Sequence, residues 1–162
     1  MKHLFLLIAL AFISCKSVKN TNQVELDNEN TTEIPEVNMN REHAPISIEA
    51  SIGLNEDKTS GSVQIIKSKL TGNKLSLKIG YSGGCSKHEF KVLGNPMISK
   101  SLPPIRSVSL IHITNGDTCR EYIEQELIID LSELAYKKET GSKIKLQFSG
   151  LDETIMYTYT AN

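Results

Sequence analysis

The sequence contains no tryptophan and few other aromatic residues, with five tyrosines and four phenylalanines among 162 residues. A surface of several aromatic platforms, of the kind that stacks nucleobases or sugar rings, is therefore not expected. The chain also lacks a basic surplus, since 18 Lys and Arg stand against 19 Asp and Glu. Nucleic acid is excluded as a partner because its binding depends on such a surplus.

The chain lacks the short motifs that accompany common catalytic sites. It contains no Gly-x-Ser-x-Gly nucleophile elbow and no His-Glu-x-x-His zinc motif. Gly83 and Gly84 follow a predicted strand, but no helical pattern follows them, so the helix N-terminus that binds phosphate is missing. The sequence therefore predicts a protein that is not an enzyme and needs no cofactor.

No apolar run is long enough to span a bilayer, which takes about 20 residues. The one marked run, residues 4–13, follows a short basic start and has the length of a signal-peptide core. It ends at Phe12-Ile13-Ser14-Cys15, which resembles the lipobox of bacterial lipoproteins. The resemblance implies that residues 1–14 are a signal peptide and that Cys15 becomes an N-terminus carrying acyl chains such as palmitate, which anchor the protein to a membrane.

The residue after the cysteine bears on which membrane this is. In some bacteria an Asp at that position retains a lipoprotein in the inner membrane, whereas this chain has Lys16. We therefore expect a protein of the bacterial cell envelope, lipid-anchored at the outer membrane rather than the inner one.

Residues 16–44 are predicted to be a flexible tether. They are rich in Asn, Thr and Glu, contain no aromatic residue and show no helical or strand periodicity. The segment is acidic, with three basic residues against six acidic ones: Lys16, Lys19 and Arg41 against Glu25, Asp27, Glu29, Glu33, Glu36 and Glu42. Together with the lipidated Cys15, it would hold the folded domain on the order of 30 Å from the membrane.

Residues 45–162 are predicted to form a single all-β domain. Short runs alternate apolar and polar residues, starting with Ile46, Ile48, Ala50 and Ile52, and no helix-length periodic stretch appears. About eight short, mostly antiparallel strands would be covered most simply by packing as a β-sandwich. The three prolines within residues 94–104 indicate a long exposed connection rather than a central strand.

Turn residues set the expected strand register. A Gly72-Asn73 turn would place Leu70 opposite Leu75 and Ile66 opposite Ile79. A four-residue loop over residues 150–153 would pair Phe148 with Ile155 and Leu146 with Tyr157.

An Asn115-Gly116 turn would pair Thr114 with Asp117, and His112 would then lie opposite Cys119 on the next strand.

Two cysteines remain once Cys15 is assigned to lipid. In a secreted chain such a pair is most simply a disulfide, here Cys85 with Cys119. Two alternatives involve neighbouring histidines. In the first, His88 and His112 would form a zinc or copper site, with reduced Cys85 and Cys119 as further ligands or with Asp117 or Glu89 as a third ligand. In the second, the protein is a thiol-dependent enzyme with Cys85 as nucleophile and His88 as base, which requires a free Cys85 thiol.

Residues 75–134 resemble a small group of uncharacterised bacterial lipoproteins. The similarity rests on the Gly-Gly-Cys-x-x-His segment at Cys85, the Asn-Gly-Asp-x-Cys turn at Cys119 and the strand end Ile-Ile-Asp-Leu-Ser-x-Leu. The resemblance implies no activity. The leading hypothesis is therefore a membrane-anchored, non-enzymatic β-sandwich that binds another envelope protein or a small ligand through its loops.

Overall fold

The computed structural model describes residues 43–54 and 60–161. The predicted signal peptide, Cys15 and nearly all of the predicted tether lie outside the described residues. Within the described ranges, no helix is both long and apolar enough to cross a membrane.

The described residues form an all-β fold, as the alternating apolar pattern predicts. Nine strands and one short 3-10 helix were found: β1 (Ile46–Glu49), β2 (Ser51–Ile52), β3 (Gln64–Thr71), β4 (Lys74–Gly83), β5 (Glu89–Ser99), β6 (Ile105–Ile113), β7 (Glu121–Asp130), η1 (Ser132–Leu134), β8 (Lys143–Phe148) and β9 (Ile155–Thr158).

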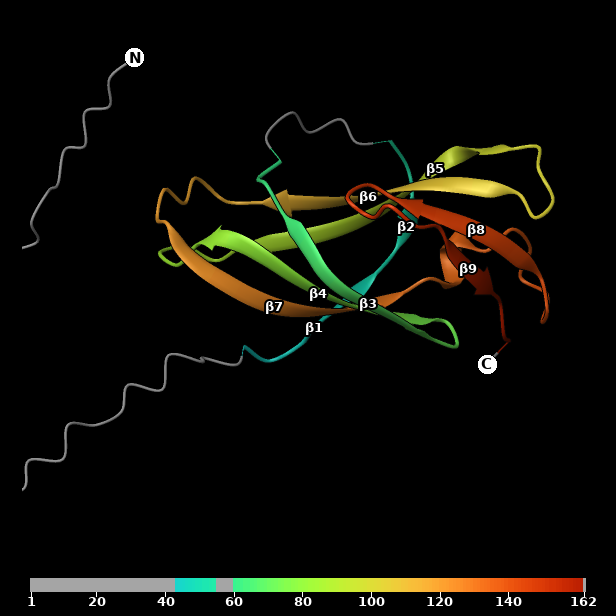
Figure 1. Ribbon diagram of the computed structural model, residues 1–162, viewed down its shortest axis with the longest axis horizontal. Helices are drawn as coiled ribbons and strands as arrows, with labels where there is room; N and C mark the ends of the chain where they lie inside the picture. Colours follow the sequence, from blue (N-terminus) through green and yellow to red (C-terminus); the bar gives the residue numbers. More distant parts are fainter. Residues whose placement is uncertain (1–42, 55–59, 162) are drawn as a thin grey trace, which may run out of the picture. The chain divides into compact units, whose positions relative to one another are not determined.

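The strands belong to two sheets, one in the order β1-β7-β4-β3 and the other in the order β2-β5-β6-β8-β9 (Figure 1). Four of the strand pairs are antiparallel, while β1 with β7, β2 with β5 and β6 with β8 are parallel. The all-β class is therefore confirmed, and both sheets are mixed. Apolar side chains of both sheets, including Leu77, Leu127, Leu146 and Phe148, form one buried core.

The first strand segment serves both sheets. The pattern of Ile46, Ile48, Ala50 and Ile52 predicts one strand, but the structure divides it at Ala50. β1 pairs with β7 in one sheet and β2 pairs with β5 in the other, so the chain passes between the sheets at this point (Figure 1). Ala50 is small enough to be buried there, and its N–H donates to the Asp130 carbonyl at 3.0 Å.

The predicted register of the β3–β4 hairpin is correct next to the turn and wrong farther along the strands. Leu70 lies opposite Leu75, as expected. The prediction that Ile66 lies opposite Ile79 is wrong, because a β-bulge between Ile65 and Lys67 brings Ile65 to that position. Ile66 is displaced from the core side and is exposed.

The β8–β9 hairpin is shifted by two residues from the predicted register. Leu146 pairs with Ile155, and Ile144 pairs with Tyr157. Phe148 instead lies opposite Val108 of β6, and the N–H of the next residue, Ser149, donates to the Val108 carbonyl. The end of β8 is therefore held by β6, and the connection to β9 is longer than four residues.

Residues 94–104 were predicted to be an exposed connection, but β5 continues through Pro96 to Ser99. Pro96 is tolerated because β2 pairs with Leu93 and Gly94, and no other described strand pairs with β5 on that side. The register shifts between Gly94 and Ile98, and the buried Arg106 donates from Nη1 to the Asn95 carbonyl at 2.6 Å. This contact holds the irregular segment against the sheet.

Candidate functional site

The β4–β5 and β6–β7 connections bring the predicted site residues together at one end of the fold. Asn115 and Gly116 have φ values of 51° and 77°, and the Asp117 N–H donates to the Thr114 carbonyl at 3.0 Å, so the predicted turn is confirmed. The strands on either side of it do not pair, however, because β6 and β7 belong to different sheets. The expected position of His112 opposite Cys119 is therefore wrong, and His112 lies opposite Phe90 of β5.

Cys85 and Cys119 form the disulfide that the sequence predicts. Their Cα atoms lie 5.8 Å apart, within the range of natural disulfides, and 34 residues separate them in the chain. The bond links the β4–β5 connection to the segment before β7. In this state Cys85 has no free thiol, so the nucleophile that a thiol-dependent enzyme requires is not available.

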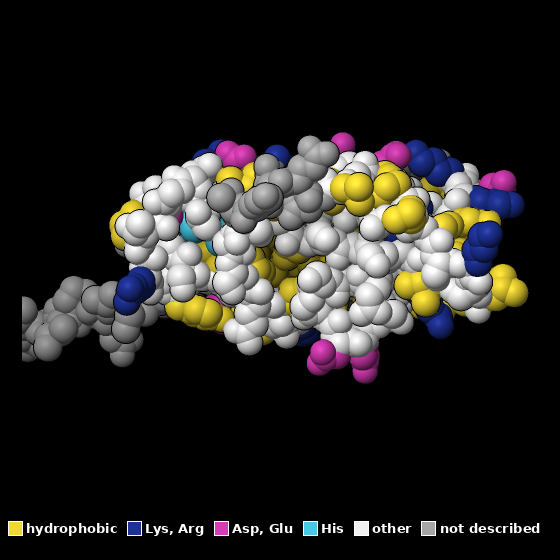
Figure 2. Space-filling view, turned by 90° about the horizontal axis from the view of Figure 1, so that it is seen from above, with side chains coloured by type: hydrophobic (Ala, Val, Ile, Leu, Met, Phe, Trp, Pro, Cys, Tyr) yellow, Lys and Arg dark blue, Asp and Glu magenta, His cyan; other side chains and the backbone are white. Residues whose placement is uncertain are grey.

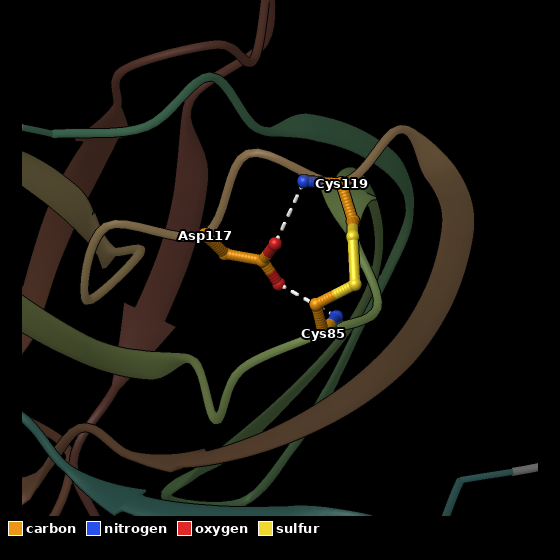
Figure 3. Close-up of side chains that lie close together, drawn as sticks. All are labelled: Cys85, Asp117 and Cys119. Carbon is orange, nitrogen blue, oxygen red and sulfur yellow. Dashed lines mark hydrogen bonds between the residues drawn. A yellow bond between two sulfur atoms is a disulfide. The ribbon is translucent and has the colours of Figure 1, made fainter.

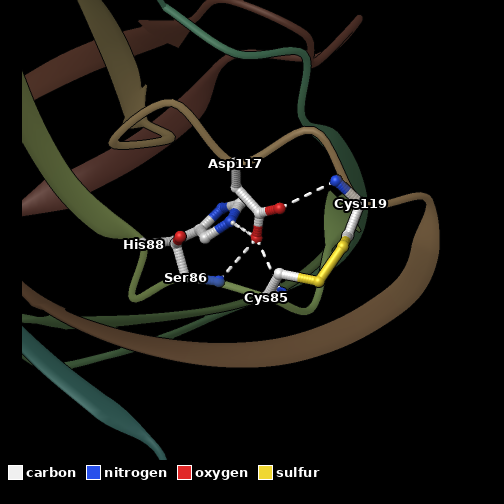
Figure 4. Close-up of a disulfide and its surroundings, with 5 residues drawn as sticks. All are labelled: Cys85, Ser86, His88, Asp117 and Cys119. Atoms are coloured by element: carbon white, nitrogen blue, oxygen red, sulfur yellow. Dashed lines mark hydrogen bonds and ion pairs between the residues drawn. A yellow bond between two sulfur atoms is a disulfide. The ribbon is translucent and has the colours of Figure 1, made fainter.

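Asp117 lies between the two cysteines and connects them through hydrogen bonds (Figure 3). Its Oδ1 accepts the Cys119 N–H at 2.8 Å, and its Oδ2 accepts the Cys85 N–H at 2.9 Å. Oδ2 also accepts the Ser86 N–H at 2.9 Å and the Nε2–H of His88 at 3.0 Å (Figure 4). One carboxylate therefore holds both ends of the disulfide and a histidine.

These donors favour the charged form of Asp117. The hydrogen bond from His88 lowers the pKa of the Asp117 carboxyl most, and the N–H groups of Cys119, Ser86 and Cys85 lower it further against a smaller opposing effect of burial. The Asp117 side chain itself has no solvent-accessible surface. The site is thus built around a buried carboxylate that stays ionised.

The two histidines bond directly to each other. Nδ1 of His88 lies 2.5 Å from Nε2 of His112. In the tautomer whose Nε2–H donates to Asp117, Nδ1 of His88 accepts and Nε2–H of His112 donates. Two nitrogens coordinating one zinc ion at tetrahedral angles would lie about 3.3 Å apart. In this arrangement the two nitrogens form a hydrogen bond and lie closer together than two ligands of one zinc ion would.

Nδ1 of His112 is buried and has no hydrogen-bond partner within the described part of the chain. Burial lowers the pKa of His112 most, and the neighbouring His88 lowers it further. The backbone of Ser62 acts in the opposite direction, but it is not in hydrogen-bonding geometry. The ring also stacks on Phe90 with centroids 4.9 Å apart and contacts Tyr81 edge-on, an environment that favours neutral imidazole.

Stability should therefore depend on pH in a window set by His112. Because its folded-state pKa lies below the ordinary value of 6.5, the unfolded chain binds more protons, so stability is complete above that value and is lost as the pH falls below it. We expect the melting temperature to fall from about pH 7.5 to about pH 5.5. Asp117 contributes in a separate window, below its ordinary value of 3.8.

Thermal denaturation of wild type and a His112→Phe variant across this range checks the prediction. The variant should lose most of the dependence between pH 7.5 and 5.5 and keep the loss of stability at lower pH. An unchanged dependence in the variant would assign it to other groups.

Glycine is required at Gly83 because of the same network. A Cβ at Gly83 would lie 2.6 Å from Nε2 of His88 and 3.3 Å from Oδ2 of Asp117. Both groups are fixed by hydrogen bonds, so Gly83→Ala is expected to lower the free energy of unfolding by about 1–3 kcal/mol.

A matched control lies three residues earlier in the same strand. The three atoms nearest to a Cβ at Gly80 would all belong to the Tyr122 side chain, which is exposed and is not held by a hydrogen bond network like that of His88 and Asp117 in the described part of the chain. Gly80→Ala should change stability by no more than about 0.5 kcal/mol. Urea denaturation of both variants measures the difference, and equal losses would contradict the rigidity assigned to the His88–Asp117 contact.

The sequence pattern indicates both cysteines and both histidines as site residues, but it does not indicate the central role of Asp117. A local signal was present: Asp117 follows the turn and stands two residues before Cys119, the spacing at which an Asp side chain accepts a backbone N–H. Its bonds to Cys85, Ser86 and His88 span about 30 residues of chain and carry no sequence signal. Glu89, the other proposed third ligand, lies in β5 and is exposed.

The fold and site define an all-β domain with one disulfide. No protein-family model and no curated protein matches the sequence. Among solved structures, the chain is similar to a NigD-like immunity protein from Bacteroides caccae, with 16% identity, 69% of this chain and 57% of that chain covered, and a TM-score of 0.47. It is also similar to a protein of unknown function from Bacteroides vulgatus, with 18% identity, 72% and 57% coverage, and a TM-score of 0.49. The chain thus spans less than two thirds of either neighbour.

Proposed function

We propose that this protein is a lipid-anchored lipoprotein of the bacterial outer membrane whose β domain binds another envelope protein without catalysing a reaction. The lipobox resemblance at Cys15 supports the anchor, and the acidic segment that follows supports a tether. The absence of catalysis is supported by the site: its thiols are joined in a disulfide and its histidines are bonded to each other and to Asp117.

The observation that carries the binding proposal is a segment of residues 97–104, the end of β5 together with the loop to β6, called here the β5–β6 connection. Met97 is 76% exposed and Leu102 is 99% exposed, the two largest values among the exposed large hydrophobic side chains. Figure 2 shows hydrophobic side chains interspersed with Lys and Arg side chains on the face it displays. Contiguous exposed apolar patches mark surfaces that contact other molecules, and we propose that these two side chains belong to such a patch.

Hydrogen bonds within the connection fix its shape. The Ile105 N–H donates to Oγ of Ser99 at 3.2 Å, and Oγ of Ser101 donates to the Pro103 carbonyl at 2.8 Å. A loop ordered before binding loses little conformational entropy on binding. Because Met97 and Leu102 project from the connection rather than line a pocket, they suit insertion into an apolar pocket of a protein partner better than enclosure of a small molecule.

Crosslinking in the native envelope tests this proposal. The wild type should crosslink reproducibly to one envelope protein, and Met97→Ser with Leu102→Ser should abolish the crosslink without changing the melting temperature. Met156→Ser, at an exposed position on β9, is the matched control and should crosslink normally. An equal crosslink in the double variant would overturn the assignment to this connection.

The anchor is tested separately. Cys15→Ala should move the protein from the membrane fraction to the soluble fraction and leave the domain folded. Retention of this variant in the membrane fraction would contradict lipidation at Cys15.

A further inference from the structure

Three side chains of metal-ligand type converge at the disulfide. The Sγ atoms of Cys85 and Cys119 and a carboxylate oxygen of Asp117 all lie within 4.8 Å of one another (Figure 3). Thiolate and carboxylate are both established zinc ligands, and two thiolates favour a soft or borderline divalent cation over magnesium or calcium. The oxidised sulfurs do not offer this chemistry, whereas the reduced ones do.

Asp117 is oriented in advance for such a role. Among the described residues, its Oδ2 accepts three hydrogen bonds and its Oδ1 accepts one, from the Cys119 N–H. Oδ1 is therefore the less occupied of the two oxygens, and a cation would approach the carboxylate there. His88 and the backbone N–H groups would then orient the ligand from behind, as outer-shell partners do in metal sites.

The disulfide is within reach of a reductant. Cys85 is exposed and Cys119 is half-buried, in contrast to the buried His88 and His112 beside them. We propose that reduction of the Cys85–Cys119 disulfide by a dithiol converts this end of the domain into a zinc-type cation site with Cys85, Cys119 and Asp117 as ligands. The inference goes beyond the proposed function and depends neither on the anchor nor on the β5–β6 connection.

Reduction of the disulfide and binding of the cation are both balanced in atoms and electrons. The dithiol transfers two electrons and two protons to the disulfide, which yields two Cys thiols and the oxidised, cyclic form of the dithiol. The divalent cation then displaces the two thiol protons and binds both thiolates and the Asp117 carboxylate. The fourth tetrahedral position is left to water.

The backbone needs little change for this site. Two thiolates bound to one zinc ion at about 2.3 Å and tetrahedral angles lie about 3.8 Å apart. The 5.8 Å between the Cα atoms of Cys85 and Cys119 accommodates this separation through rotation of the two side chains. The Asp117 contacts to both backbone N–H groups are retained, because they do not involve the sulfur atoms.

Metal titration of the full mature chain in detergent tests the inference. After reduction with a dithiol and its removal under anaerobic conditions, the protein should bind one Cd²⁺, with a thiolate-to-metal absorption band in the ultraviolet, and should bind Zn²⁺ in competition. The oxidised protein should bind neither. Zn²⁺ should also raise the melting temperature of the reduced protein, since it binds only the folded site.

Variants distinguish a site with three ligands from metal binding by the two cysteine thiols alone. Asp117→Asn should weaken Zn²⁺ binding at least about tenfold, and Cys119→Ala should abolish the Cd²⁺ band. Asp152→Asn, at an exposed carboxylate in the β8–β9 connection, should change nothing. Circular dichroism of each reduced variant records whether its sheets persist. If the reduced wild type binds no metal, or if Asp117→Asn binds as tightly as wild type, the three-ligand site is overturned.

Discussion

Replacing Cys85 and Cys119 together with serine is expected to lower the free energy of unfolding by about 2–5 kcal/mol. The disulfide closes a loop with a sequence separation of 34 residues, for which the chain-entropy relation gives about 4 kcal/mol. A loss of this size is a large part of the total stability of a domain, about 5–15 kcal/mol. The variant should therefore fold weakly or be degraded in the cell.

Urea denaturation under oxidising conditions measures the loss, and wild type with a dithiol is the control. The reduced wild type, measured without metal, should approach the stability of the double variant, because both lack the same covalent constraint. Equal midpoints for oxidised wild type and double variant would mean that the Asp117 hydrogen bonds alone hold the two segments together.

Replacing Tyr157 with alanine is expected to cost about 3–5 kcal/mol, because the ring is fully buried in the core and leaves a large cavity. Tyr157→Phe should cost only about 0.5–1.5 kcal/mol, since it removes just the hydroxyl group. That hydroxyl donates to Oδ1 of Asn73 at 3.0 Å, and burial, followed by the charge of Asp130, raises the pKa of Tyr157 to about 12. Urea denaturation of the two variants separates packing from hydrogen bonding.

Asn73 explains why the hydroxyl group matters. Its Nδ2 donates to the Thr160 carbonyl at 2.6 Å, and its Oδ1 accepts the Thr160 N–H at 3.1 Å as well as the Tyr157 hydroxyl. These contacts join the β3–β4 turn of one sheet to the end of β9 in the other. Asn73→Ala should therefore cost at least as much as Tyr157→Phe. A loss for Tyr157→Phe as large as for Tyr157→Ala would contradict this division.

The two predicted hairpins show how far the alternation of apolar and polar residues along a strand determines the register. Leu70 and Leu75 meet as predicted because the Gly72-Asn73 turn fixes them locally. In the second hairpin, Leu146 and Tyr157 both face the core, but their partners are shifted by two residues. A two-residue shift leaves every side chain on the same face, so the apolar pattern alone does not distinguish the two registers.

The candidate site divides in a similar way. The Asn115-Gly116 turn and the cysteine pair follow from short-range chemistry and the small number of cysteines, and both were predicted. The sequence predicts that His88 and His112 lie near each other, but it does not predict their direct contact. That contact depends on β6 pairing with β5 in one sheet while β7 belongs to the other. Asp117 contacts its four donors because β6 pairs with β5 and not with β7.

The sequence by itself determined the all-β class, the turn at Gly72-Asn73, the turn at Asn115-Gly116 and the cysteine pair, because each depends on residues that are near one another or few in number. Only the tertiary structure decided which sheet each strand joins, where β3 bulges and how Asp117 links both cysteines to the histidines. Those features depend on packing two sheets over one core. The energy of that packing belongs to contacts between segments far apart in the chain, and the alternating pattern is equally compatible with several such arrangements.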